Sequence, residues 1–473
     1  HRRTPAGRLV TGSGPAPAEP RPGVLDRMLG LFSDIRAGEG GRALLMLVNI
    51  FLILVSYYVI KTVREPLILN TDVPEFLGRL GIRGPAEVKT YAAAGQALVL
   101  MAFVPAYSWF ASRVDRIKLV YGVTLFFVLN IVGFAFAVDS GSSYVGVVFY
   151  VWVGFFSLSI IAQFWSFAND IYTKDEGNRI FPIVALGMTA GSPAGAWIAE
   201  KMFSAHIPTH SMLYVAAAVL FSTLVIYTIV NRGTRKAAVP GKATNEERPL
   251  EGRSGFTLVL ASRYIFLIAV LMILLNLVNT NGEYILSRLV VAQAEAALAA
   301  DPTFDTGAFI GSFYGNYFFW VNIIAVVFQA FLVSRLVKYL GLAGVLFALP
   351  LTAIGAYGFI AIGVTSLGIV RWVKTAENAT DYSVMNTARQ LLWLPTSREE
   401  KYKAKQAVDS FFVRFGDLVS AVVVYAGTTW LALEVGGFAL LNVGVVLVWM
   451  GVAVVLVREN RRLSAKVGAS NTD

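Results

Sequence analysis

The chain has 473 residues, of which 56% are hydrophobic and only 15% are charged. A soluble protein of this length carries nearer a quarter charged residues, so the composition excludes an ordinary soluble globular protein. The chain has no cysteine, which excludes disulfides, thiol catalysis and cysteine-bound clusters.

The first residues are rich in Pro, Gly and Arg. Residues 1–23 lack an apolar core, which predicts a disordered arm and argues against a signal peptide. Residues 24–36 then alternate apolar and charged positions at helical spacing. The segment 24–41 is therefore expected to be amphipathic and to lie on the cytoplasmic membrane surface.

Apolar runs of roughly 20 residues, the length needed to cross a bilayer, recur from there to the end of the chain. They do not alternate as strands of a membrane barrel do, so they favour helices. The sequence predicts an all-α membrane protein with twelve transmembrane helices. These spans are placed near 42–64, 90–111, 118–138, 143–166, 179–201, 212–231, 263–287, 309–334, 339–364, 367–393, 405–432 and 436–457.

Lys and Arg concentrate in every second loop and near both ends of the chain. By the positive-inside rule, these loops and both termini are expected to face the cytoplasm. The net charge of +10 is then explained by topology, and a nucleic-acid partner is not expected.

The longest loop divides the spans into two groups of six. The expected domains are a bundle over 42–231, a linker over 232–262, a second bundle over 263–457 and a cytoplasmic tail over 458–473. Two motifs recur in the same order in each half; in the first, "KTVREPLIL" aligns with "NTNGEYILS". This pattern predicts two six-helix pseudo-repeats in the manner of major facilitator transporters.

The end of the first span carries Lys61, Arg64 and Glu65 before the apolar run resumes. Cations buried here would suit an anionic substrate, since Arg binds phosphate or carboxylate in a bidentate manner. The alternative is an ion pair between Lys61 and Glu65 at the outer interface, with Pro66 loosening the helix.

The tenth span is the most densely charged. Steps of three, three and four place Arg371, Lys374, Glu377 and Asp381 along one helical stripe, which predicts a water-lined pathway. The alternative is a set of self-neutralising pairs, with some side chains reaching the interface.

Three other spans also carry polar residues. Asn276 and Glu283 share one face of the seventh span, although asparagines can also hold helices together. Arg414 and Asp417 lie in the eleventh. The fourth ends with a cluster that consists of Trp165, Phe167, Asn169 and Asp170. This cluster could be either an interfacial belt or a base-stacking surface.

The chain offers no metal, cofactor or enzyme signature. His206 and His210 flank a proline in a short polar loop, which is typical of an ordinary loop. There is no phosphate-binding loop motif, and the Gly-rich stretch at 187–195 lies in a span, where small residues allow close helix packing. Neither a nucleophile–base pair nor a metal constellation is visible.

Four segments together resemble the nucleotide transport proteins, the ATP/ADP translocases of plastids and obligate intracellular bacteria. They are "IKTVREPLIL", "FWSFANDIYTKDEGNRIFP", "NLVNTNGEYILSR" and the stretch that contains "LPTSREEKYKAKQAVD", and the resemblance extends over about 42–425. It implies a twelve-helix exchanger of the major facilitator type. It also places Lys61 and Arg64 where the family keeps basic residues, and Glu283 where it keeps an important acid.

Two departures from the family pattern concern charge. Asp381 and Asp417 stand where the family usually has lysine, which opposes binding of a polyphosphate unless a proton or cation accompanies it. The sequence is closer to divergent relatives in free-living bacteria, whose substrate the resemblance does not define. The expected location is the bacterial inner membrane.

Together these observations predict an alternating-access transporter of an anionic nucleotide or related phosphorylated metabolite. Two alternatives stay open: a transporter of another organic anion coupled to protons, and a non-transporting sensor or scaffold with a cytoplasmic regulatory partner. The residues expected to bind substrate are Lys61, Arg64, Glu65, Trp165, Phe167, Asn169, Asn276, Glu283, Arg371 and Lys374. Those expected to couple or gate transport are Asp170, Glu377, Asp381, Arg414 and Asp417.

Overall fold

The structure is a computed structural model that describes residues 35–36, 39–111, 114–237 and 254–470. The predicted arm at 1–23, most of the amphipathic segment at 24–41 and the middle of the linker lie outside the described residues.

The regular structure within these ranges is helical, as the apolar runs predict. The N-terminal half comprises α2 (Gly40–Leu69), α3 (Glu75–Arg79), α4 (Pro85–Ala111), α5 (Arg116–Val138), α6 (Ser143–Ile171), α7 (Lys174–Ser204) and α8 (Thr209–Ala237). The C-terminal half begins with α9 (Gly255–Ala261), α10 (Arg263–Ala300), α11 (Thr306–Val327), η1 (Phe328–Leu332) and α12 (Val333–Ala361). It continues with α13 (Leu367–Thr380), η2 (Asp381–Met385), α14 (Asn386–Leu392), η3 (Glu400–Ala404), α15 (Lys405–Ala407), η4 (Val408–Phe412), α16 (Val413–Thr429) and α17 (Val435–Ser470).

Several helices extend beyond the predicted spans because local signals carry them further. α4 begins at Pro85, a residue suited to a first helical turn because its missing N–H would be unpaired there. α7 begins with a capping box, in which the Thr173 side chain accepts from the Glu176 backbone and the Glu176 side chain accepts from the Thr173 backbone. α10 continues to Ala300, past the predicted end at 287.

Among the described residues, nine helical stretches have the length and hydropathy to cross a membrane. One of them, Thr306–Ala361, is two spans in one, because Gly341 breaks the helix with a φ of 61°. That backbone conformation favours glycine, which has no Cβ to clash. The tenth predicted span is interrupted by the π-helical turn η2 and the eleventh by η4, so neither forms one long regular helix.

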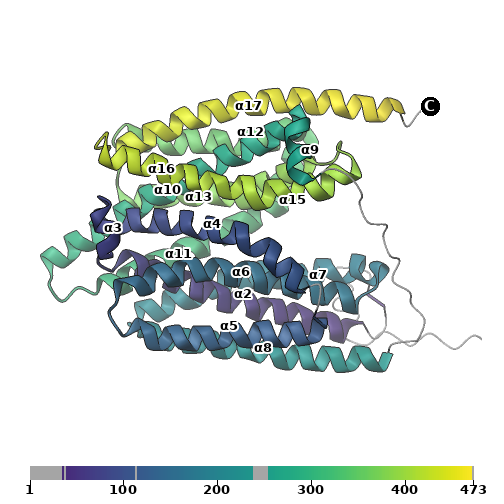
Figure 1. Cartoon of the computed structure of the whole chain (residues 1–473), viewed down its shortest axis with the longest axis horizontal. Coiled ribbons are helices and arrows are strands. Elements are labelled where there is room, and N and C mark those ends of the chain that lie inside the picture. Colours follow the sequence, from purple (N-terminus) through teal and green to yellow (C-terminus); the bar gives the residue numbers. More distant parts are fainter. Residues whose placement is uncertain (1–34, 37–38, 112–113, 238–253, 471–473) are drawn as a thin grey trace, which may run out of the picture.

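The helices form two bundles that lie side by side: most of α2 to α8 lie in the lower part of Figure 1 and most of α9 to α17 in the upper part, with α4 and α11 where the bundles meet. Within the first bundle α2 packs on α7 and α8, and within the second α10 packs on α16 and α17. Two sets of contacts join the bundles: α11 packs on α7 and α2, and α4 packs on α16 and α10. The first described residues of α2 and the end of α17 lie at the same end of the molecule (Figure 1).

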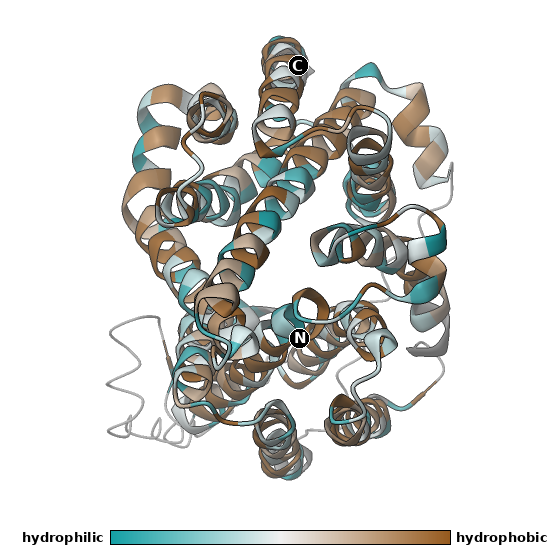
Figure 2. Ribbon diagram, turned by 90° about the vertical axis from the view of Figure 1, so that its left-hand side faces the viewer, coloured by the Kyte–Doolittle hydropathy of each residue, from teal (hydrophilic) through white to brown (hydrophobic). Residues whose placement is uncertain are grey.

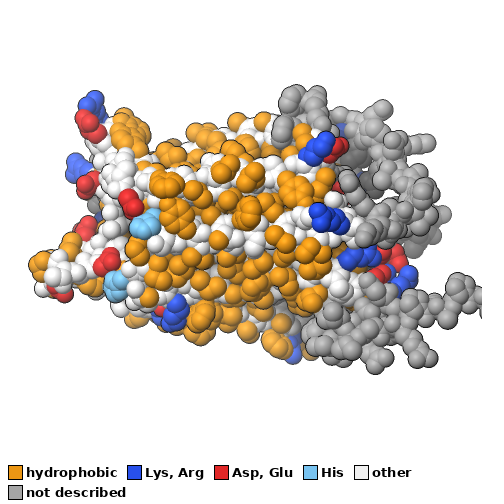
Figure 3. Space-filling view, turned by 90° about the horizontal axis from the view of Figure 1, so that it is seen from below, with side chains coloured by type: hydrophobic (Ala, Val, Ile, Leu, Met, Phe, Trp, Pro, Cys, Tyr) orange, Lys and Arg blue, Asp and Glu red, His pale blue; other side chains and the backbone are white. Residues whose placement is uncertain are grey.

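The outer surface has the pattern of a protein in a bilayer. Figure 3 shows hydrophobic side chains over the middle of one face, while charged side chains gather at its two ends. Viewed from one end, most helices are seen nearly along their axes and hydrophobic residues predominate on them (Figure 2). An apolar band flanked by charge is what helices crossing a bilayer require.

Candidate functional site

A polar cavity of about 290 Å³ lies between the two bundles. Both halves contribute to it, and it is lined by charged, amide and aromatic side chains. The polar lining residues are Lys61, Arg64, Lys89, Gln96, Ser157, Asn276, Asn279, Thr280, Glu283, Asn378, Arg414 and Asp417.

α2 supplies two cations to this cavity because it stays helical through its charged segment as far as Leu69. Arg64 donates from Nε to Oε1 of Glu65 at 3.0 Å, and its guanidinium lies 4.2 Å from the centre of the Tyr150 ring. Among the described residues, no carboxylate lies within 4 Å of the Lys61 ammonium, which instead lies 4.3 Å from the centre of the Phe318 ring. The ion pair between Lys61 and Glu65, the alternative interpretation of this segment, does not form in this structure.

Lys89 joins the two bundles at the cavity. Its ammonium lies 2.7 Å from Oε2 of Glu65 in α2 and 3.8 Å from Oε2 of Glu283 in α10. It also donates to Ser287 at 3.0 Å. Sequence reasoning missed this residue by starting the second span at 90. The Pro85 helix-start signal would have brought Lys89 into the helix.

Glu283 is held by the second bundle on its other side. Asn378 donates to Oε1 of Glu283 at 3.1 Å, and Tyr317 donates to the same atom at 3.3 Å. Glu65 and Glu283, which correspond in the repeat alignment, therefore face the same lysine from opposite halves.

Asp417 forms a carboxylate site on the α10–α16 side of the cavity. Its Oδ1 accepts from Asn276 and from Thr280, each at 2.7 Å. Arg414 lies 3.8 Å from Oδ2. The predicted residues of the seventh and eleventh spans are thus brought together in one place.

The charged stripe predicted for the tenth span is divided among three environments. Lys374 and Glu377 are buried and form a 3.0 Å ion pair, and Tyr357 also donates to Glu377. Arg371 donates to Asn316 at 2.9 Å and lines a separate pocket. Asp381 lies in the π-helical turn η2 and pairs with Arg389 at 2.8 Å.

The aromatic cluster predicted at the end of the fourth span lies outside the residues that line the cavity. Trp165 packs edge-on against Phe181, and Phe167 is buried against Tyr227. Asn169 and Asp170 are exposed. The structure does not bring these four residues together with the cations of α2.

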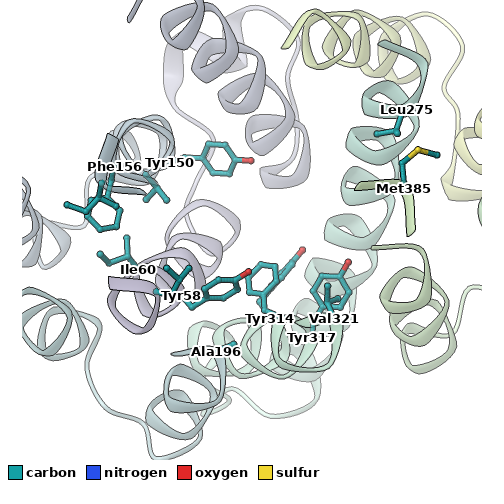
Figure 4. Close-up of a cluster of buried hydrophobic side chains, with 14 of the residues drawn as sticks. Tyr58, Ile60, Tyr150, Phe156, Ala196, Leu275, Tyr314, Tyr317, Val321 and Met385 are labelled. Atoms are coloured by element: carbon teal, nitrogen blue, oxygen red, sulfur yellow. The ribbon is translucent and has the colours of Figure 1, made fainter. Parts of the chain in front are cut away.

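Other aromatic side chains line the cavity instead, namely Tyr57, Tyr150, Phe318 and Tyr382. In Figure 4 the rings of Tyr58 from α2 and of Tyr314 and Tyr317 from α11 lie in a row, and Tyr150 lies apart from them. Sequence reasoning missed all of these, because aromatic residues are frequent in every span and only tertiary packing selects those that meet.

The two bundles also meet at the end of the molecule that carries the 205–208 and 301–305 connections. Ser204 and Ser312 are hydrogen-bonded with their Oγ atoms 3.1 Å apart, and Thr306 donates to Asn70 at 2.6 Å. A Cβ at Gly315 would lie 2.8 Å from the Glu200 backbone, so a glycine is what lets α11 approach α7 this closely.

A family model described as TLC ATP/ADP transporter matches residues 142–460. The chain belongs to this family. The sequence resemblance to the ATP/ADP translocases is thereby confirmed, and the description of the family is that of a transporter and not of an enzyme. This protein is accordingly a multi-pass membrane protein.

Curated relatives in two Chlamydia species are similar to parts of the chain. One, named "ADP,ATP carrier protein 1" from Chlamydia pneumoniae, is 23% identical over 56% of this chain and 57% of its own length. Another of the same name from Chlamydia trachomatis is 24% identical over 55% of this chain and 54% of its own. The chain thus spans about half the length of the curated relatives that it matches.

Solved transporter structures share the fold at low identity. The nucleoside transporter NupG is 14% identical with a TM-score of 0.58, covering 89% of this chain and 98% of its own. The POT family transporter PepTSo is 11% identical with a TM-score of 0.62, over 89% and 98% of the two chains. A bacterial homologue of the iron transporter ferroportin is 16% identical with a TM-score of 0.60, over 88% and 98%. These likenesses support the predicted major-facilitator-type fold.

Proposed function

We propose that this protein is an alternating-access transporter that carries an anionic nucleotide or related phosphorylated metabolite through the cavity between its bundles. The observation that carries the proposal is the cationic wall of that cavity, built from Lys61, Arg64 and Lys89. Charges shielded from water are costly unless they are paired, and the partly buried Lys61 has no carboxylate beside it among the described residues. An anionic substrate would supply the missing partner.

The chemistry of the wall suits phosphate oxygens. The guanidinium of Arg64 can donate to two oxygens at once, and the Lys61 ammonium adds a compact charge one helical turn away. The rings of Tyr57, Tyr150 and Tyr382 offer surfaces on which a base could stack. Relatives named as ADP,ATP carriers support a nucleotide over other phosphorylated molecules.

The proposed topology has twelve spans with both termini in the cytoplasm of a bacterial cell, across its inner membrane. The distribution of Lys and Arg supports it, because the basic loops would all lie inside. The contact between Ser204 and Ser312 then lies at the outer end. A cavity closed at that end corresponds to a cytoplasm-facing state of the transport cycle.

Coupling between substrate and conformation would use the carboxylates around the cavity. Lys89 binds Glu65 in its own bundle more closely than Glu283 in the other. The bundles cannot separate at this end without breaking the Lys89–Glu283 contact. A substrate anion that draws Lys89 away from Glu283 would therefore favour opening. Asp381 and Glu377, each already paired within the second bundle, are proposed as groups that stabilise it during this movement.

The test is uptake of labelled nucleotides into proteoliposomes, with thermal stabilisation of the detergent-purified protein measured in parallel. The ligand panel contains nucleotides, inorganic phosphate and non-nucleotide organic anions. The wild type is expected to bind and transport a nucleotide, and Lys61→Ala is expected to lose both. Lys118→Ala, which removes the same charge from a side chain that is 75% exposed, is the matched control and should change neither.

The other outcomes discriminate between the alternatives. Tight binding without uptake in well-reconstituted protein would indicate a sensor or scaffold. Uptake of a non-nucleotide anion alone, driven by a pH gradient, would indicate a proton-coupled transporter of a different substrate.

A further inference from the structure

We propose that the substrate is a phosphate monoester of low charge, a nucleoside monophosphate in chemical class, and not a nucleoside triphosphate. This inference rests on the proposed function and specifies its substrate. It is carried by the balance of charged side chains around the cavity.

The cavity has few cations that are free to neutralise a substrate. Four cations line it, but Arg64 and Lys89 both bind Glu65, which is buried directly behind them. Arg414 faces Asp417 across 3.8 Å. Among the described residues, this leaves the Lys61 ammonium as the lining cation with no carboxylate within 4 Å.

The surplus positive charge is correspondingly small. Against the four lining cations stand Glu283 and Asp417 in the lining and Glu65 behind it, so a formal excess of one positive charge remains. A phosphate monoester carries about −1.5 to −2 at neutral pH, which is close to what this site can balance. A triphosphate carries more, and its further charges would meet Glu283 and Asp417 in a region shielded from water, where repulsion between like charges is strong.

Asp417 contributes most directly to this limit on substrate charge because its carboxylate is held in place in the cavity wall. Its side chain is 11% exposed, and two donors, Asn276 and Thr280, bind the same oxygen. These two hydrogen bonds fix the orientation of the carboxylate in the cavity wall. Oδ2 remains beside Arg414, where it reduces the attraction that this cation can exert on a substrate.

The experiment changes this one charge in steps and measures relative affinity for adenosine mono-, di- and triphosphate, without divalent cations. Asp417→Asn keeps the shape and adds one unit of positive charge; Asp417→Lys adds two. Asp409→Asn is the matched control, since Asp409 lies on the same span, is exposed and does not line the cavity. Displacement of a bound labelled nucleotide from the purified full-length protein gives the three affinities for each variant.

We expect the wild type and Asp409→Asn to bind the monophosphate at least tenfold more tightly than the triphosphate. That ratio should fall in Asp417→Asn and reverse in Asp417→Lys. If Asp417→Lys does not fold, the isosteric Asp417→Asn still decides the direction of the change. A wild type that prefers the triphosphate, or a ratio that is the same in all variants, would overturn the inference while leaving the transport proposal intact. Failure of every variant to bind any phosphate compound would instead overturn the proposed function, and this inference with it.

Discussion

The two halves of the protein use corresponding helices in different ways. Arg64 of α2 corresponds to Gly282 of α10 in the repeat alignment. A Cβ at Gly282 would lie 2.7 Å from Nζ of Lys374 and would collide with the hydroxyl of Tyr357. The second bundle thus fills the place of the arginine with a lysine from a neighbouring helix. That lysine is already neutralised by Glu377 at 3.0 Å.

A second pair of corresponding positions shows the same difference. Lys61 of α2 corresponds to Asn279 of α10, so one half contributes a cation to the cavity lining where the other contributes an amide. Among the charged residues of the two aligned segments, only the glutamates are kept in both halves, and Lys89 lies between Glu65 and Glu283. The comparison teaches that the first bundle offers a substrate the Lys61 ammonium, which has no carboxylate beside it among the described residues, whereas Lys374 of the second bundle is neutralised by Glu377 and serves packing.

The largest effect on stability is expected from removing Lys374, the cation that is neutralised within the second bundle. Lys374→Ala leaves Glu377 buried without its partner, which costs about 3–5 kcal/mol of the free energy of unfolding. Thermal and denaturant unfolding in detergent would measure this loss. The double variant Lys374→Met with Glu377→Gln removes both charges and should recover much of it; a stability loss as large as that of the single variant would contradict this role of the pair.

Removing Lys61 of the first bundle should have the opposite effect, with little loss of stability and a large loss of binding. Lys61→Ala removes a charge that contacts only aromatic rings among the described residues, so stability should change by less than about 1 kcal/mol. Nucleotide affinity should fall about tenfold or more, because a hydrogen bond to a charged group contributes about 1.5–3 kcal/mol. Titration of the purified variant measures the loss, and Lys61→Arg should restore much of the binding. Equal stability losses in Lys61→Ala and Lys374→Ala would remove the distinction between the halves.

The close packing at Gly282 gives a smaller expected effect. Gly282→Ala forces the Tyr357 hydroxyl and the Lys374 ammonium to move, and such overpacking costs about 1–3 kcal/mol of stability. Its matched control is Gly355→Ala on α12, where a new Cβ meets open space. The control should be neutral or slightly stabilising, because alanine favours a helix more than glycine does. An unchanged melting temperature in Gly282→Ala would show that this half has room for a larger residue.

The smallest effect is expected at Trp165. Because this ring packs on Phe181 away from the cavity lining, Trp165→Ala should change nucleotide affinity less than about twofold. Tyr150→Ala, which removes a ring at the cavity and the stacking partner of Arg64, should weaken binding measurably. The reverse order of the two effects would restore the predicted base-stacking role of the fourth span.

Much of the fold could be predicted because long apolar runs, loop charge and internal repeats are properties of the chain itself. The cations of α2 could also be predicted, since charges are rare in a span and conspicuous there. The division of the tenth span could not, because it is set by partners on other helices, Asn316 of α11 for Arg371 and Tyr357 of α12 for Glu377. Lys89 was missed for a local reason, the position of one helix start. The pairing of Asp417 with Asn276 joins helices far apart in sequence and is set by tertiary packing alone.

The most direct test of the transport account uses the contact at the proposed outer end. The chain has no native cysteine, so Ser204→Cys and Ser312→Cys together introduce a single reactive pair at a site where the native Oγ atoms are 3.1 Å apart. Nucleotide uptake by this double variant in proteoliposomes should stop on oxidation and return on reduction, while each single variant stays active. Uptake that continues when cross-linking is complete would contradict alternating access through this cavity.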